Sequence, residues 1–103
     1  MAKLRDAVTN LNAVTSTGAG SSINAAAGDG STWAIIASSV SSGGTVLIQG
    51  SLDGTNWATL STTSVGANGT TGVAITGRWS FLRANVSART DGTFTVKCAL
   101  WES

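Results

Sequence analysis

The stretch FLRANVSARTDGTFTVKCALW, from Phe81 to Trp101, decides the fold of this chain. Apolar and polar residues alternate one for one on each side of the dipeptide Asp91-Gly92. Successive side chains of a β-strand point to opposite faces of a sheet, and Asp-Gly between two such runs favours a tight turn. The stretch therefore predicts a β-hairpin with one apolar face directed at a core. That face consists of Leu82, Ala84, Val86, Ala88, Phe94, Val96, Cys98 and Leu100.

The opposite face of the predicted hairpin combines aromatic and basic side chains. It carries Phe81, Arg83 and Arg89 from the first strand and Trp101 from the second. Aromatic residues and arginine are enriched where proteins contact one another. We expect these four side chains to form an interaction surface. The alternative is that a loop or the N-terminal segment covers one of the aromatic rings.

The chain from about residue 32 onward consists of short β-rich runs separated by turn residues. Turn signals at intervals of about 8–12 residues are typical of antiparallel sandwiches and barrels. The expected fold is all-β, a single-domain antiparallel β-sandwich or jelly roll of about seven to eight short strands with an extended N-terminal segment. The expected strands span residues 32–40, 45–52, 57–63, 70–76, 80–89 and 93–102.

The first part of the chain, residues 1–31, is less regular. Leu4, Val8 and Leu11 have helical spacing, but the Thr and Asn residues around them are weak helix formers, which favours an extended segment. This segment forms either an arm on a neighbouring subunit or the first strand pair, and residues 32–103 form the β-sandwich core. In an arm, Leu4 and Leu11 are candidate interface residues.

The heptapeptide SLDGTNW, residues 51–57, is the strongest candidate for a ligand site. A calcium ion needs about six to eight oxygen ligands, and the five acidic residues of the chain are scattered. A hairpin accounts for the motif better, because Asp53 and Gly54 suit a turn and Trp57 can begin the returning strand. We predict a structural turn built from Ser51, Asp53, Gly54 and Trp57, with no metal ion.

The composition argues against catalysis. There is no histidine, so the single cysteine, Cys98, lacks the usual base, and its place in an apolar alternation predicts a small buried side chain. The net charge is +1 with dispersed basic residues, which disfavours a nucleic-acid partner, and no apolar run is long enough for a bilayer. We expect no enzymatic activity, no catalytic residue, no cofactor, and no nucleic-acid or membrane partner. Only 11% of residues are charged, which suits a surface covered in an assembly.

From about Val14 onward the chain resembles small β-sandwich virion proteins of tailed bacteriophages. The pattern Ser-x-Asp-Gly-x-x-Trp at residues 51–57 and the pattern aromatic-x-Arg-Ala-x-Val at residues 81–86 carry the resemblance. It implies a head decoration or cement protein, or a module of a tail or adsorption structure. Such a protein is made in the host cytoplasm and resides on the virion, with the head surface favoured. The implied partners are the major capsid protein and further copies of this chain, with a homotrimer favoured.

Two functions are therefore expected. The first is a decoration protein that binds the assembled head and stabilises it through protein–protein contacts. The alternative is a glycan-binding or adhesion module of a tail or fibre, in which an exposed tryptophan stacks on sugar rings. The candidate tryptophans for that role are Trp33, Trp57 and Trp79.

Overall fold

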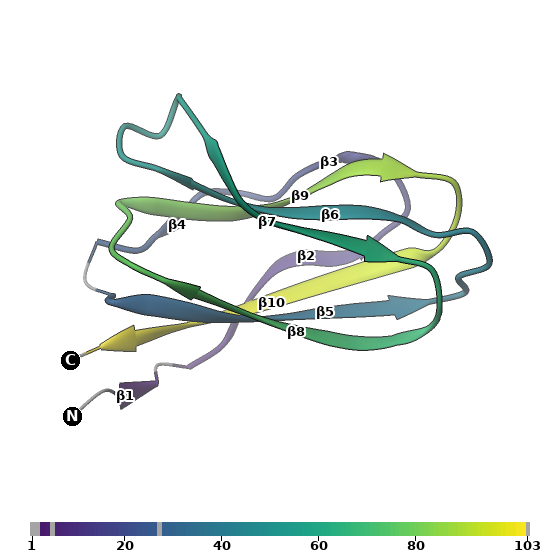
Figure 1. Cartoon of the computed structure of the whole chain (residues 1–103), viewed down its shortest axis with the longest axis horizontal. Helices are drawn as coiled ribbons and strands as arrows, with labels where there is room; N and C mark the ends of the chain where they lie inside the picture. The colour runs from purple at the N-terminus through teal and green to yellow at the C-terminus, as the bar shows by residue number, and fades with distance from the viewer. Residues whose placement is uncertain (1–2, 5, 27, 103) are drawn as a thin grey trace.

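Two antiparallel β-sheets packed face to face form the molecule (Figure 1). The computed structural model describes residues 3–4, 6–26 and 28–102. The strands are β1 (Lys3–Leu4), β2 (Val8–Val14), β3 (Gly18–Ala19), β4 (Ile23–Asn24), β5 (Gly30–Ser38), β6 (Gly44–Ser51), β7 (Ala58–Val65), β8 (Gly69–Thr76), β9 (Phe81–Arg89) and β10 (Thr93–Glu102). Sheet A contains β10, β5 and β8 in that order, with β1 and β2 both on the free side of β10. Sheet B contains β9, β6 and β7, with β3 and β4 both on the free side of β9.

The strand order is that of a jelly roll. Starting at β2, the chain passes to sheet B at β3 and β4, returns to sheet A at β5, and forms the β6–β7 hairpin in sheet B. It then crosses to sheet A at β8, to sheet B at β9 and to sheet A at β10. Each sheet thus has four strand positions, as in the two interlocked Greek keys of this fold. The predicted all-β sandwich or jelly roll is confirmed, and the six strands expected after residue 30 are present within a few residues of their predicted ends.

The hairpin predicted over residues 80–102 was wrong in one respect. Its two strands alternate as expected, but β9 pairs with β6 in sheet B and β10 pairs with β5 in sheet A. The alternation shows that each strand has one apolar face. It does not show whether the two faces lie side by side or opposite each other across a core. In this molecule they face each other.

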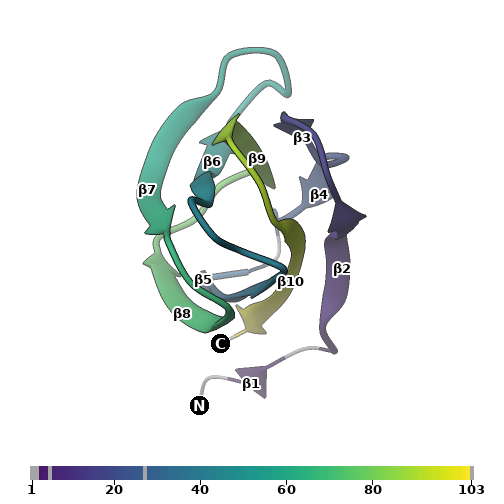
Figure 2. The same ribbon diagram turned by 90° about the vertical axis from the view of Figure 1, so that its right-hand side faces the viewer.

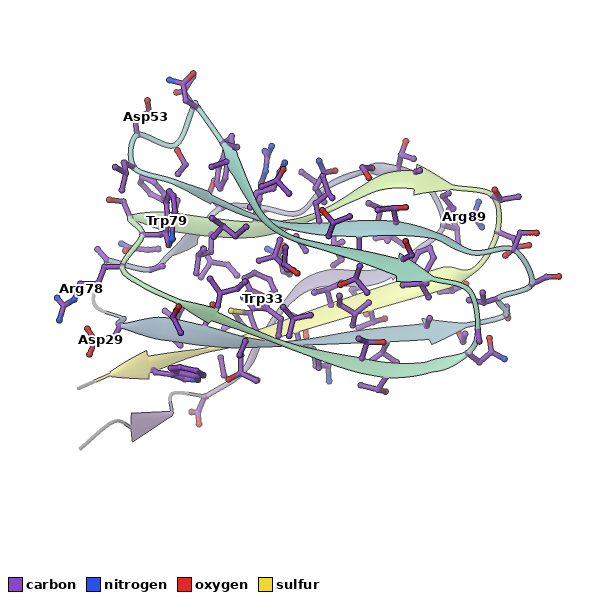
Figure 3. The ribbon with its side chains drawn as sticks, in the orientation of Figure 1. Asp29, Trp33, Asp53, Arg78, Trp79 and Arg89 are labelled. Carbon is purple, nitrogen blue, oxygen red and sulfur yellow. The ribbon has the colours of Figure 1, made fainter. Side chains whose placement is uncertain are left out.

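The core between the sheets contains the predicted apolar face almost in full. Trp33 and Phe94 are its largest fully buried side chains, and Cys98 is buried as expected. Ala88 is the exception and is exposed, at the end of β9. Figure 3 shows Trp33 between the two sheets. Its indole Nε1 donates to the hydroxyl of Ser31 at 2.8 Å, so this buried N–H has a partner.

The first four strands, β1 to β4, are edge strands of the sandwich itself. In Figure 2, β2, β3 and β4 lie on one side of the molecule and β7 and β8 lie on the opposite side. β1 places Lys3 opposite Glu102, and β2 pairs with β10. Leu11 is only 6% exposed and belongs to the core, so the expectation that it is an interface residue was wrong. The candidate side chain of Leu4 lies outside what the structure describes.

Candidate functional site

The four side chains expected to form one interaction surface do not lie together. Phe81 and Arg83 project from β9 on the outer face of sheet B. A register shift of β9 against β6 at Ser87 reverses the alternation, so Arg89 leaves that face and its Nε donates to the carbonyl of Gly92 at 2.9 Å. Trp101 projects from β10 on the outer face of sheet A, where its Nε1 donates to the hydroxyl of Thr32 at 2.7 Å. This separation follows directly from the placement of β9 and β10 in different sheets.

On sheet B the structure brings a different set of residues together. The guanidinium carbon of Arg83 lies 4.2 Å from the ring centroid of Trp57, in a cation–π contact. The Nε of Arg83 donates at 2.9 Å to the side-chain oxygen of Gln49, its neighbour across the β6–β9 pair. Leu52, at the start of the β6–β7 loop, is 70% exposed. We call Trp57, Phe81 and Arg83 the Trp57–Arg83 surface.

The SLDGTNW loop carries Trp57 to this surface, and its polar groups bind one another. The carboxylate of Asp53 accepts the N–H groups of Asn56 and Thr55, the side-chain amide of Asn56 and the hydroxyl of Ser51. These hydrogen bonds, led by the Asn56 N–H, hold the pKa of Asp53 far below its usual range. Gly54 has φ 78°, a left-handed conformation that glycine adopts readily. The motif is a turn, as its sequence predicts, and its carboxylate serves the turn.

Phe81 lies beneath the same loop. A Cβ added to Gly54 would be 3.5 Å from the Phe81 ring, which is ordinary van der Waals contact. The sequence left open that a loop covers one of the aromatic rings. Phe81 is that ring, and its side chain is half-buried. The loop and the ring together support one end of the Trp57–Arg83 surface.

Asp91 joins two loops at the other end of the sandwich. Its carboxylate accepts the N–H groups of Ser41, Ser42 and Gly43 from the β5–β6 connection, at 2.8 to 3.1 Å. These backbone hydrogen bonds lower the pKa of Asp91. Figure 3 shows Asp53 at one end of β9 and Arg89, next to this junction, at the other. The two turn aspartates are therefore too far apart to act as a catalytic pair.

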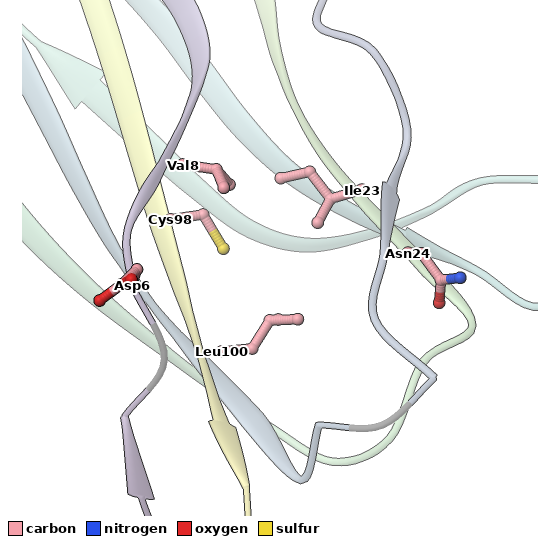
Figure 4. A pocket seen from close by; sticks show the side chains of 6 residues that line it. All are labelled: Asp6, Val8, Ile23, Asn24, Cys98 and Leu100. Carbon is pink, nitrogen blue, oxygen red and sulfur yellow. The ribbon is translucent and has the colours of Figure 1, made fainter.

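A cavity of about 350 Å³ opens between edge strands β2 and β4 (Figure 4). Its lining consists of Asp6, Val8, Ile23, Asn24, Cys98 and Leu100. Burial raises the pKa of the Cys98 thiol to about 12, so the sulfur stays protonated at neutral pH. In the part of the chain that the structure describes, no three His, Cys, Asp or Glu side chains are grouped as metal ligands. The same part has no helix that could cross a membrane.

The three tryptophans considered for sugar stacking have different environments. Trp33 is fully buried, so its proposed contact with a sugar was wrong. Trp79 packs against the core over Gly50 and is half-buried. Trp57 is half-buried on the outside of sheet B, beside Arg83. A surface tryptophan site is therefore centred on Trp57.

Sequence reasoning missed Asn10. Its side-chain oxygen accepts the N–H of Ala84 at 2.7 Å, and its side-chain nitrogen donates to the carbonyl of Ser21 at 2.7 Å. Asn10 thereby fastens β2 of sheet A to β9 of sheet B. An asparagine in an extended segment gives no signal of such a contact, because the partner lies 74 residues away.

Comparison with known proteins gives a likeness of fold. No protein-family model and no curated protein matches the chain. Among solved structures, the chain is similar to the SPBc2 prophage-derived protein YomS, with a TM-score of 0.74 and 17% sequence identity. The match covers 99% of this chain and 96% of YomS. The whole sandwich, including its N-terminal edge strands, therefore has a counterpart in a prophage-derived protein.

Proposed function

We propose that this chain is a structural protein of a phage virion that decorates the assembled head and stabilises it by binding the major capsid protein. The observation that carries the proposal is the match with the prophage-derived YomS over nearly the full length of both chains. The phage-like sequence patterns at residues 51–57 and 81–86 support it, since both contribute to one surface of the fold. Jelly rolls are frequent in viral shells.

The protein acts by binding, without a chemical reaction, in this proposal. The carboxylates of Asp53 and Asp91 are held by the N–H groups of loops, and the thiol of Cys98 is buried and protonated. A subunit that binds only the assembled shell stabilises it by RT ln(1 + [L]/Kd). This is about 2.7 kcal/mol per site when the free subunit is at a hundred times Kd.

The Trp57–Arg83 surface is the contact with the shell. Its guanidinium is already fixed by Gln49 and by the Trp57 ring, so little side-chain freedom is lost on binding. The loop that carries Trp57 also has an exposed apolar side chain, that of Leu52. Tryptophan and arginine at the centre of a contact commonly dominate its binding energy.

The test is co-sedimentation of the purified protein with emptied heads of the phage that encodes it. Trp57→Ala should weaken binding at least about 30-fold, the effect of losing about 2 kcal/mol at a central contact, and Leu52→Ser should weaken it less. Val8→Ser is the matched control, because Val8 is also a large exposed apolar side chain and belongs to β2, which lies across the sandwich from β7 in Figure 2. Binding that survives Trp57→Ala and Leu52→Ser unchanged would exclude this surface, and no binding by the wild type would exclude the function.

A second function, glycan recognition, is supported by the position of Trp57 alone. A half-exposed indole beside an arginine and the polar side chain of Asn56 suits a sugar ring. Calorimetric titration with bacterial surface glycans should then give binding that Trp57→Ala abolishes, together with no binding to heads. Head binding without any sugar binding would leave the decoration function alone.

A further inference from the structure

The sandwich has two kinds of sheet edge. On one side, sheets A and B end in β1, β2, β3 and β4, and on the other side they end in β8 and β7 (Figure 2). An edge strand exposes backbone N–H and C=O groups that can pair with another chain. Proteins usually prevent such pairing with short strands, bulges, prolines or charged side chains.

The N-terminal edges carry these protections. β1, β3 and β4 have two residues each, and the β2–β10 pairing has register shifts on both sides of Val96. Ala13 in β2 has φ 50°, which breaks the regular strand. Between β3 and β4, the peptide groups of Ala84 are bound by Asn10 and by the N–H of Gly20. Little regular backbone is left there for a second chain.

The β8 edge has none of these protective features. β8 pairs with β5 in eight consecutive register pairs, from Gly30 opposite Thr76 to Ala37 opposite Gly69, without irregularity. No strand lies beyond β8 among the residues described here. Residues 57–77, which include all of β7 and β8, contain no charged residue and no proline. β7 differs from β8 in having a register shift against β6 between Ile48 and Gln49. β8 is therefore the regular, uncharged and unpaired edge of the molecule.

We propose that β8 pairs antiparallel with β8 of a second copy of this chain, so that two A sheets form one continuous sheet across a two-fold axis. Charge favours this partner. A different protein would be selected through complementary charges, and β8 offers none. A charged edge paired with itself would place like charges opposite each other, which an uncharged edge avoids.

The length of the edge fits such a contact. Eight residues at about 3.4 Å each give a ladder about 27 Å long, against a longest dimension of 40 Å for the molecule. Pairing along one edge buries less surface than a broad interface and falls near the lower end of stable contacts, about 1,200 Å² in total. Association should therefore depend on concentration. The product is a dimer, in contrast to the trimer that the phage resemblance implies.

Light scattering after size exclusion, over a series of concentrations, tests the pairing. The wild type should reach twice the 10.3 kDa mass of the chain. The double substitution Gly72→Lys and Ala74→Lys should leave a folded monomer. Ala74 is exposed, and a Cβ at Gly72 meets no atom within 4 Å, so the fold has room for both side chains. Asn12→Lys, at an exposed position of β2 on the other edge of sheet A, is the matched control and should remain dimeric.

Hydrogen exchange of the wild type gives an independent reading. Amides of residues 69–76 should gain protection as the protein concentration rises, while those of β2 should not. A wild type that stays monomeric up to its solubility limit overturns the proposal. So does an oligomer whose mass the folded lysine variant leaves unchanged. If the lysine variant fails to fold, the absence of concentration-dependent protection in residues 69–76 overturns it instead.

This inference stands apart from the proposed function. A monomeric lysine variant that still binds heads would show that pairing is separate from head binding. A dimer that binds no head would support the pairing and exclude the decoration function.

Discussion

The side chain of Asn10 links the two sheets, and nothing in the sequence around it predicts this role. The sequence-based prediction of an interaction surface relied on aromatic and basic residues, because their side chains can bind a partner wherever they are exposed. An asparagine becomes structural only when its partners are known. The backbone of Ala84 meets Asn10 through folding of the entire chain, so residue-level reasoning had no means of finding the pair.

Replacing Asn10 should destabilise the fold. Asn10→Ala leaves the buried N–H of Ala84 without its acceptor, and an unsatisfied buried donor costs about 1–3 kcal/mol. Urea unfolding measures the loss. Asn12→Ala, at an exposed position of the same strand, is the control and should change stability by less than about 0.5 kcal/mol. Equal losses for the two variants would contradict the role of Asn10.

The turn aspartates should make stability depend on acid pH. The pKa of Asp91 is lower in the folded protein than the 3.8 of a free aspartate, because its carboxylate accepts three loop N–H groups. Its contribution is therefore complete above about pH 4 and is lost as the pH falls through the folded pKa. Asp53 acts in the same direction.

Thermal melts between pH 7 and pH 2 provide the measurement. Asp91→Asn should lower the melting temperature at neutral pH and flatten its decline below pH 4. Thr59→Asn, at an exposed neutral position of β7, should keep the wild-type slope. A wild-type slope in Asp91→Asn would show that the carboxylate does not govern acid stability.

At the level of strands, the sequence predicted the elements well and their partners poorly. Alternation placed β9 and β10 accurately, because a half-buried strand has a period of two residues. Which strand pairs with which depends on how the apolar faces of all the strands pack together. The sequence of a single strand does not contain this information. The interaction surface was therefore assembled from residues that lie on opposite outer faces, while Trp57, predicted to lie in a turn or against a sugar ring, was not expected beside Arg83.

The connection between β5 and β6 depends on one glycine. Gly43 has φ 85°, and a Cβ there would overlap the carbonyl oxygen of Val65. Gly43→Ala should therefore lower the free energy of unfolding by about 1–3 kcal/mol or more, the cost of holding a residue in a strained left-handed conformation. Gly66→Ala is the control, since a Cβ at Gly66 meets no atom within 4 Å and should alter stability little. Chemical denaturation of both variants tests the difference, and similar stabilities would contradict it.

For the whole molecule, Cys98 reports on opening of the core. It is 1% exposed beneath the edge formed by β2, and its thiol is protonated at neutral pH. Reaction with a thiol reagent should therefore be slow and should follow the global unfolding transition in urea. Rapid labelling in buffer without urea would show instead that β2 detaches while the rest of the sandwich stays folded.

The distribution of charge in the fold separates two kinds of association. Residues 30–52 and 57–77 carry no charge, Asp29 pairs with Arg78, and Arg83 of β9 lies on the outer face of sheet B. Ionic strength therefore acts on the two proposed contacts unequally. Added salt screens the attraction between Arg83 and an acidic partner, because the screening length is about 10 Å at 0.1 M. It leaves a ladder of backbone amides between neutral strands almost unchanged. If both proposals hold, subunits paired through β8 stay together as the salt concentration rises, while their binding to the shell weakens.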